Sequence, residues 1–219
     1  MMNKTNTTES DEVKRMLMVQ LEEDAYVDVG EDIKYPPVAI SCGTYQDVDF
    51  NGNHTEYPIP IGTYGNFSFV QAPPKSMKSF FCSLLVSAYQ QNGNKFTGKI
   101  KGHRQGKKII HFDTEQGLFH CQKVFRRTMV MNDLQEDKNY HTYSLRSMSY
   151  KSRIDFIEYI LKDKFEGEGI GLVIIDGAAD LVSDVNNIEQ CNEITQRLMS
   201  WTVDYNCHIS TIIHSNFGS

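Results

Sequence analysis

The stretch "FSFVQAPPKSMKSFF", residues 67–81, decides the fold predicted for this chain. It begins with aromatic and apolar residues of the kind that favour a β-strand. Two prolines then mark a turn, and the apolar run that follows Lys78 and Ser79 is typical of a helix. A strand, a turn and a helix that opens with a lysine and a hydroxyl form a unit that can hold phosphate.

The turn matches the phosphate-binding pattern GxxxxGK[ST] at its end but lacks both glycines. Aligned with that pattern, the loop reads Ala72-Pro73-Pro74-Lys75-Ser76-Met77-Lys78-Ser79. In the pattern, backbone N–H groups surround the phosphates, the lysine reaches the β and γ oxygens, and the hydroxyl holds magnesium. Met77 replaces the second glycine, so the loop needs a conformation there that accepts a Cβ. Taken alone, the loop is either a nucleotide site or a helix start that carries lysines.

Downstream of this loop, strand patterns alternate with helical patterns. We expect strands at residues 67–71, 108–112, 140–145, 171–175 and 208–213, and helices at 78–91, 117–132, 151–164 and 188–205. The apolar runs "GLVII" and "HISTII" suit strands that are buried on both faces, as in a parallel sheet covered by helices. The sequence therefore predicts a three-layer α/β/α domain with a mostly parallel, RecA-like sheet and the fold of a P-loop NTPase.

The segments before this core have a different composition. Residues 1–35 are acidic, and we expect a disordered start followed by a short amphipathic helix near 13–21. Residues 36–66 are interrupted by proline and glycine, which favours a lead-in that wraps the core over a regular element. The core itself is assigned to residues 67–219, with a flexible loop at 95–107.

The overall composition is that of a globular protein. The chain has 219 residues and 40% hydrophobic content, enough for one domain with appendages. No stretch reaches the roughly 18 apolar residues of a membrane helix, and the polar start does not resemble a secretory signal, so we expect a cytoplasmic protein without a membrane partner. The five scattered cysteines predict neither a zinc site nor a disulfide framework.

Charge is distributed unevenly along the chain. The formal net charge is −6, yet residues 95–127 carry nine bases against two acids, whereas residues 1–35 carry nine acids against four bases. A basic block of this kind could face the phosphate backbone of DNA. The alternative, a solvated basic loop, stays open.

Two carboxylates follow predicted strands. Glu115 lies in "KKIIHFDTEQG" just after an apolar strand, and Asp176 ends the apolar run of "GLVIIDGAADLV". In an open parallel sheet, ligands lie beyond the carboxyl ends of the strands, so both residues can meet a ligand held by Lys78. Glu115 could then polarise water, and Asp176 could hold a metal ion directly or through its water. A turn or helix cap is the alternative role for Asp176.

A third strand end carries His214, followed by Asn216. A polar side chain at this place could sense the γ-phosphate and relay its presence to the following loop. The alternative is a histidine that only satisfies nearby backbone groups.

With these residues together, the chain resembles the RecA-like AAA-family P-loop ATPases of mobile elements and of plasmid or phage replication modules, which include helicase-like proteins. The similarity is strongest to a divergent group in Bacteroidetes elements. It covers about residues 65–219 and rests on "KSMKS", "FDTEQ", "VIIDGAADLV" and "IIHSN". In that group the loop takes forms such as KSxK[ST], so the missing second glycine is a family trait and a working site is expected.

The resemblance implies ATP and Mg²⁺ as cofactors and a role for each site residue. The nucleotide-binding residues would be Ala72, Pro73, Pro74, Lys75, Ser76, Met77, Lys78, Ser79 and Phe80. Lys78 and Glu115 would be catalytic, with Glu115 orienting the attacking water. Ser79 and Asp176 would hold the metal, and His214 would sense hydrolysis. Lys75 would add a second charge on the phosphate side.

The resemblance also implies a homo-oligomer, either a ring or a filament. RecA-like motors usually take a catalytic arginine from a neighbouring subunit, often from sequence beyond the strand at which this chain stops, so we expect a shortened chain. Arg126 and Arg127 are possible substitutes, although arginines on a helix surface are more often solvated.

Three functions remain open at this point. The leading one is an ATPase that works on DNA as a helicase-like or loading factor for a mobile element. The second is an adaptor that binds ATP, hydrolyses it weakly and gathers partners through its acidic tail. The third is a small-molecule kinase, which would need an acceptor pocket and an arginine-rich lid that the sequence does not show.

Overall fold

The structure is a computed structural model that describes residues 9–31, 33–48, 51–73, 75–91 and 97–214. The chain divides into two compact units, Met1–Tyr35 and Pro36–Ser219. The first unit contains helix α1 (Glu9–Ala25), which is longer than the predicted amphipathic helix and keeps its apolar side chains exposed. Most of the predicted disordered start lies outside the described residues.

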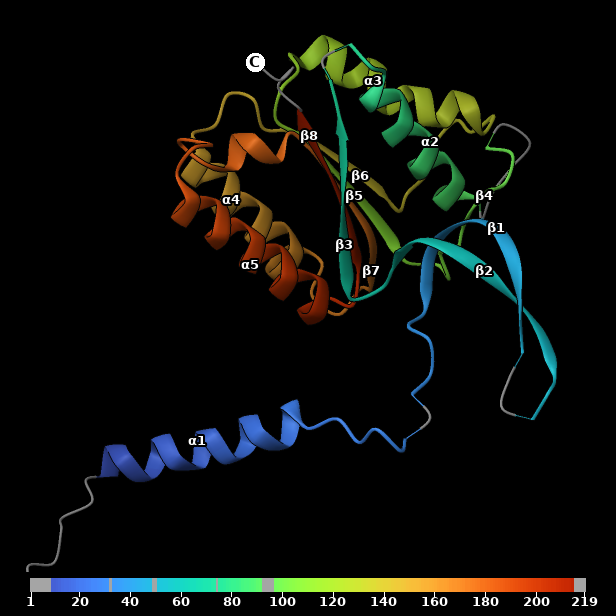
Figure 1. The fold of residues 1–219 in the computed structure, drawn as a ribbon. Helices are drawn as coiled ribbons and strands as arrows, with labels where there is room; N and C mark the ends of the chain where they lie inside the picture. The colour runs from blue at the N-terminus through green and yellow to red at the C-terminus, as the bar shows by residue number, and fades with distance from the viewer. Residues whose placement is uncertain (1–8, 32, 49–50, 74, 92–96, 215–219) are drawn as a thin grey trace, which may run out of the picture. The chain divides into compact units, whose positions relative to one another are not determined.

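The second unit is built on a five-stranded parallel sheet (Figure 1). Its strands, in spatial order, are β3 (Asn66–Ala72), β8 (His208–His214), β7 (Ile170–Asp176), β5 (Lys108–Asp113) and β6 (Tyr140–Ser144). Each pair of neighbours runs in parallel, so all five carboxyl ends lie at one edge of the sheet.

Helices cover both faces of this sheet, which confirms the predicted three-layer architecture. Figure 1 shows α2 (Lys78–Gln90) and α3 (Leu118–Met131) on one face, and α4 (Tyr150–Tyr159) and α5 (Ile188–Asp204) on the other. A π-helical turn, Ile160–Lys164, extends α4, and a 3-10 turn, Ala178–Leu181, follows β7. The predicted strands and helices are all present, because their apolar patterns match the burial that the layers impose.

The core forms two clusters, one on each face of the sheet. Strand β7 contributes to both, since Leu172 and Ile174 face α2 while Val173 and Ile175 face α4 and α5. Every residue of β7 is buried. A continuous apolar run is therefore required at this strand, and an alternating one would place polar side chains in one of the two clusters.

The segment before the core is regular, in contrast to the predicted wrapping lead-in. It forms β1 (Val38–Val48) and β2 (His54–Thr63), which pair with each other and, through β1, with β4 (Ile100–Gly102) in a separate antiparallel sheet. The prolines of "YPIPIG" lie within β2. They are accommodated because β2 is an edge strand, where an N–H group that faces away from β1 makes no ladder hydrogen bond, and because the register with β1 shifts between the partners of the two prolines.

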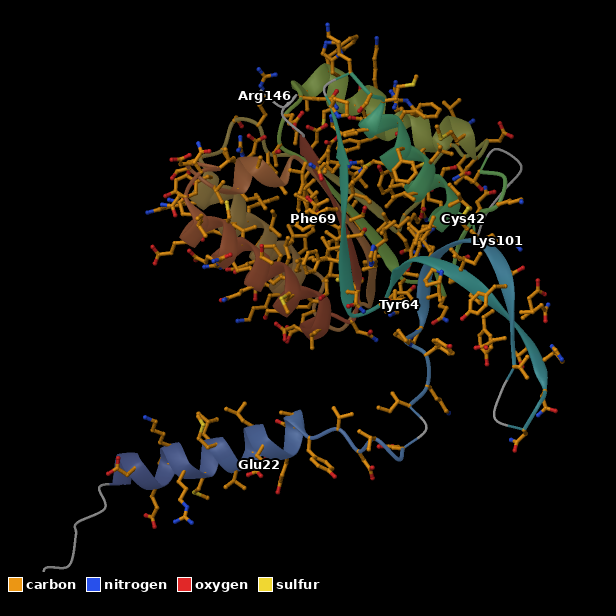
Figure 2. All side chains as sticks on the ribbon, in the orientation of Figure 1. Glu22, Cys42, Tyr64, Phe69, Lys101 and Arg146 are labelled. Atoms are coloured by element: carbon orange, nitrogen blue, oxygen red, sulfur yellow. The ribbon has the colours of Figure 1, made fainter. Side chains whose placement is uncertain are left out.

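A pair of buried tyrosines joins this small sheet to the core. The Tyr64 and Tyr89 hydroxyl oxygens are 2.5 Å apart, and the Tyr64 hydroxyl also donates to the His103 carbonyl oxygen at 2.8 Å. Figure 2 shows Tyr64 where β2 meets the core. Burial raises the pKa of both tyrosines, so they stay neutral and fully able to donate.

We predict that buried His111 in β5 makes the protein sensitive to mild acid. Burial lowers the pKa of its imidazole from 6.5 to about 3. The unfolded chain binds this proton near pH 6.5, so the contribution of His111 to stability is complete above that pH and is lost as the pH falls toward 3.

Thermal melting of the wild type and of His111→Gln between pH 7.5 and 5 tests this prediction. Once the pH is well below 6.5, the free energy of unfolding of the wild type should fall by about 1.4 kcal/mol more per pH unit than that of the variant. Both proteins keep the other buried histidines, so the difference isolates His111. Parallel curves would contradict the prediction.

Candidate nucleotide-binding site

The loop between β3 and α2 has the shape of a phosphate loop without its glycines. Met77, at the position of the second glycine, has φ 64° and ψ 26°, and Lys75 has φ 62°. Both residues therefore occupy the left-handed region that glycine enters freely and other residues enter at a cost of about 1 kcal/mol. The loop thus has left-handed residues although it lacks glycine. The Met77 side chain points outward and is 73% exposed.

Lys78 is the first residue of α2 and is held against the loop. Its side chain is only 8% exposed, and Nζ donates to the carbonyl oxygens of Ala72 at 3.0 Å and Pro73 at 2.9 Å. The Ser76 hydroxyl also donates to the Pro73 oxygen, at 2.6 Å. These bonds stabilise the turn and place an ammonium group beside the backbone that would surround a phosphate.

Ser79, the next residue, links the loop to β7, which is separated from β3 by β8 in the sheet. The Ser79 hydroxyl donates to Oδ2 of Asp176 at 3.0 Å. Asp176 is the last residue of β7 and is 3% exposed. The two residues predicted to hold the metal, 97 positions apart in the sequence, are thus in direct contact.

A magnesium ion fits this pair. The described residues contain no cluster of three metal-binding side chains, but Mg²⁺ is commonly held by one or two protein oxygens together with substrate phosphates and water. A hydroxyl and a carboxylate in contact next to Lys78 are such a donor set. The chemistry of the donors therefore agrees with a metal that binds with the nucleotide.

The loop after β5 holds Glu115 at the same edge of the sheet. Asp113, which stands in register with Asp176, accepts hydrogen bonds at Oδ1 from the backbone N–H groups of Glu115 (3.0 Å) and Gln116 (2.8 Å). Asp113 is fully buried, and this burial raises its pKa. Asp113 is not among the predicted site residues, although an aspartate whose side chain binds a backbone N–H group two residues on is a common turn signal.

Thr114 and Gly177 fix this loop against the end of β7. The Thr114 hydroxyl donates to the Asp176 carbonyl oxygen at 2.8 Å and also lies 2.8 Å from Oδ2 of Asp180. Gly177 has φ 107°, and a Cβ there would lie 2.2 Å from the Thr114 hydroxyl oxygen and 3.1 Å from Cγ of Glu115. Only glycine allows this approach, which brings Glu115 beside Gly177, the residue that follows Asp176.

The remaining predicted site residues are described only in part. The backbone of His214 pairs with Ala72, so this residue stands at the start of the loop, but its side chain lies outside what the structure describes. Pro74 and Asn216 also lie outside the described residues. The roles assigned to all these residues stay predictions.

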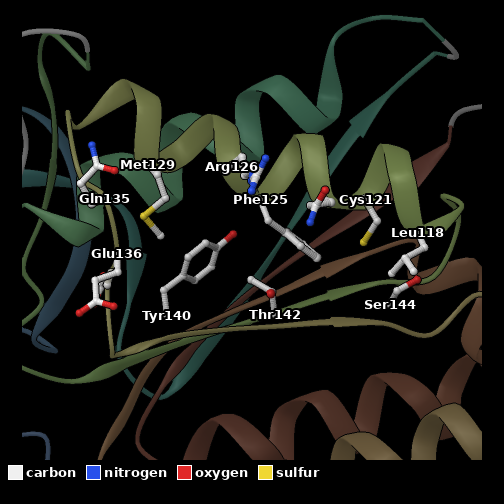
Figure 3. A pocket seen from close by; sticks show the side chains of 12 residues that line it. Leu118, Cys121, Phe125, Arg126, Met129, Gln135, Glu136, Tyr140, Thr142 and Ser144 are labelled. Carbon is white, nitrogen blue, oxygen red and sulfur yellow. The ribbon is translucent and has the colours of Figure 1, made fainter.

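Among the described residues, α3 adjoins cavities of two kinds. One of about 340 Å³ is lined by residues 75–80 of the loop and by Arg127. A larger one of about 430 Å³ lies between α3 and β6, with Phe125, Met129 and Tyr140 among its lining residues (Figure 3). Of these two, the smaller cavity contains the lysine and hydroxyl of the loop, so it is the candidate site for a nucleotide.

The described cations of the predicted basic block differ in their surroundings. Arg104 pairs with Asp137 at 2.8 Å, and Lys108 pairs with Glu168 at the same distance. Lys107 donates to a backbone oxygen at 3.1 Å. These three cations have structural partners, while Lys99, Lys101 and Lys123 are exposed on separate elements.

We predict that Met77 tolerates glycine but not a β-branched residue. Met77→Gly removes the strain of a left-handed backbone but also adds conformational freedom to the unfolded chain. The free energy of unfolding, measured in urea, should therefore change by less than about 0.5 kcal/mol. Met77→Val should lower the free energy of unfolding by about 1 to 2 kcal/mol, because a branched Cβ is poorly accepted at positive φ.

The matched control is Met199→Val, at an exposed position in α5. It should lose about 0.5 kcal/mol, since only helix propensity changes. Equal losses at the two sites would show that Met77 does not need a left-handed backbone.

None of the described helices combines the length and the hydropathy of a membrane span.

The comparison with curated proteins gives no match. The model of a family described as an AAA domain matches residues 59–218, from β2 to beyond β8, which is well over half of the chain. This match, together with a phosphate loop in contact with an aspartate at a strand end, indicates a nucleotide-binding P-loop ATPase. The chain belongs to the AAA domain family.

Proposed function

We propose that this protein binds MgATP at the loop between β3 and α2 and hydrolyses it, and that it acts on DNA as a helicase-like or loading factor in the replication or transfer of a mobile element. The observation that carries the ATPase part is the hydrogen bond between Ser79 and Asp176, with Lys78 adjacent. The DNA part rests on the resemblance of the sequence motifs and on exposed lysines.

Nucleotide binding uses the loop and the start of α2. The N–H groups in the first turn of a helix have no partners within the helix, and the helix dipole favours an anion there. Lys78 exchanges its bonds with two carbonyl oxygens for bonds with phosphate oxygens. These new bonds are stronger, because both partners are charged.

Ser79 and Asp176 would hold the magnesium ion, which neutralises phosphate charge and orients the β- and γ-phosphates when bound. For this the Ser79 hydroxyl must release its hydrogen bond to Asp176. Asp176 is well suited to the task because the buried strand β7 fixes its backbone.

Hydrolysis requires a water molecule aligned with the γ-phosphate. Glu115 is exposed, and the bonds from Asp113 and Thr114 orient the loop that carries it. Glu115 would orient this water, the role that a glutamine has in other P-loop enzymes, and its carboxylate, unlike an amide, can also accept the proton of the water. His214, whose backbone pairs with the first residue of the loop, would sense the phosphate. A homo-oligomer, in which a neighbouring copy supplies the arginine, completes the proposal.

An adaptor that binds ATP and hydrolyses it only weakly is the second candidate. It is favoured by Met77, which stands where the pattern has its second glycine and has a left-handed backbone. The two functions differ in turnover, so phosphate release separates them.

We predict that Lys78→Ala and Glu115→Gln separate binding from hydrolysis. Lys78→Ala should weaken ADP binding at least about tenfold, since a charge-assisted contact is lost. Glu115→Gln should keep ADP affinity and lower kcat about 100-fold or more. Calorimetric titration and steady-state phosphate release measure the two effects.

Glu189→Gln, at an exposed position in α5, is the matched control and should change neither quantity. If the wild type binds ADP but releases phosphate no faster than Glu115→Gln, the adaptor is correct. If no nucleotide binds, both candidates fail.

We also predict that single-stranded DNA stimulates phosphate release by the wild type. The effect should decrease as salt rises from about 50 to 200 mM, because DNA binding by lysines releases counterions. A rate that is unchanged by DNA at the lowest salt would rule out the DNA-dependent role and leave the ATPase intact.

A further inference from the structure

Arg127 reaches the phosphate loop from a different helix. It is a residue of α3, which packs beside α2, and it lines the same cavity as residues 75–80. It is the only lining residue of this cavity, within the described chain, that comes from outside the loop and the first turn of α2.

Contacts with α2 hold this side chain in place. The guanidinium carbon lies 5.4 Å from the centre of the Phe80 ring, within the range of a cation–π interaction. Nη1 also donates to the Ser83 hydroxyl at 3.4 Å. The side chain is half-buried, so its cation is positioned before any ligand binds.

The adjacent arginine provides a contrast. Arg126 is exposed and lines the cavity between α3 and β6, where Figure 3 shows it near Phe125. Consecutive helical residues point about 100° apart, so one arginine faces the loop and the other does not. Of the two arginines on this helix, only Arg127 lines the loop cavity.

The order of residues in the loop indicates which phosphate Arg127 would meet. In a phosphate loop the lysine reaches the β and γ oxygens, while backbone N–H groups surround the α- and β-phosphates. Lys78 and Ser79 thus mark the β–γ end. Phe80, whose ring Arg127 contacts, is the next residue along α2, and the α-phosphate, the next group of the nucleotide, would lie on this side of the loop.

We propose that Arg127 binds the α-phosphate of the nucleotide in the same subunit, and so selects nucleotides over shorter phosphate chains. This inference rests on the proposed nucleotide site. Because the α-phosphate does not react, Arg127 contributes to ground-state affinity and positioning, and its loss raises KM with little change in kcat.

The test compares the wild type with Arg127→Gln and Arg127→Lys. Glutamine removes the cation but retains an amide that can still donate to Ser83, and lysine retains the charge. Calorimetric titrations use a non-hydrolysable ATP analogue, ADP and inorganic pyrophosphate, which lacks the α-phosphate. Arg126→Gln is the matched control, and thermal melting checks the fold of each variant.

Arg127→Gln should weaken binding of the ATP analogue and ADP about tenfold, the loss expected for one charge-assisted contact. Pyrophosphate affinity should change less than about twofold, and Arg127→Lys should give intermediate losses. Arg126→Gln should bind all three ligands as the wild type does.

Three results would overturn the inference and leave the nucleotide site intact. In the first, Arg127→Gln binds ADP with the affinity of the wild type. In the second, its affinities for pyrophosphate and for ADP fall equally, which indicates a distorted loop. In the third, only its kcat falls, which indicates that Arg127 acts on the γ-phosphate. The proposed function fails separately, if the wild type does not bind ADP or if Lys78→Ala binds it equally well.

Discussion

The burial of strand β7 on both faces is the constraint on which the site depends. Its side chains alternate between the two hydrophobic clusters, so a shift of one residue along its neighbours would place each cluster's residues in the other. Parallel pairing then fixes where β7 ends relative to β5 and β8. Asp176 reaches Ser79, and Glu115 comes beside Gly177, because that register is fixed.

The phosphate loop shows that the required property is a backbone conformation and not a residue type. Lys75 and Met77 take positive φ values that glycine would take more easily. The bonds from Lys78 and Ser76 to loop carbonyls help to offset this strain. A pattern search for glycine rejects such a loop, whereas the lysine and hydroxyl at the start of a helix are still recognisable.

The lead-in before the core shows where sequence patterns fail. Prolines normally argue against a strand, and residues 36–66 were therefore expected to be irregular. The prolines of β2 are tolerated only because nothing pairs with its outer edge among the described residues, and a local pattern carries no information about a strand's neighbours. Asp113 was missed for a related reason. Its importance lies in two hydrogen bonds to the loop that carries Glu115, which depend on how the chain turns after β5.

The sequence by itself determined the order along the chain of the five parallel strands and of the helices that cover them, the three-layer class, and the presence of carboxylates near the ends of β5 and β7. It could do so because burial on two faces demands continuous apolar runs, and helices demand a period near 3.6 residues. Only the tertiary structure decided which strands are neighbours, which of two adjacent arginines faces the loop, and that the basic residues are divided among several elements. These are consequences of contacts between residues that are distant in the chain, and no local pattern encodes them.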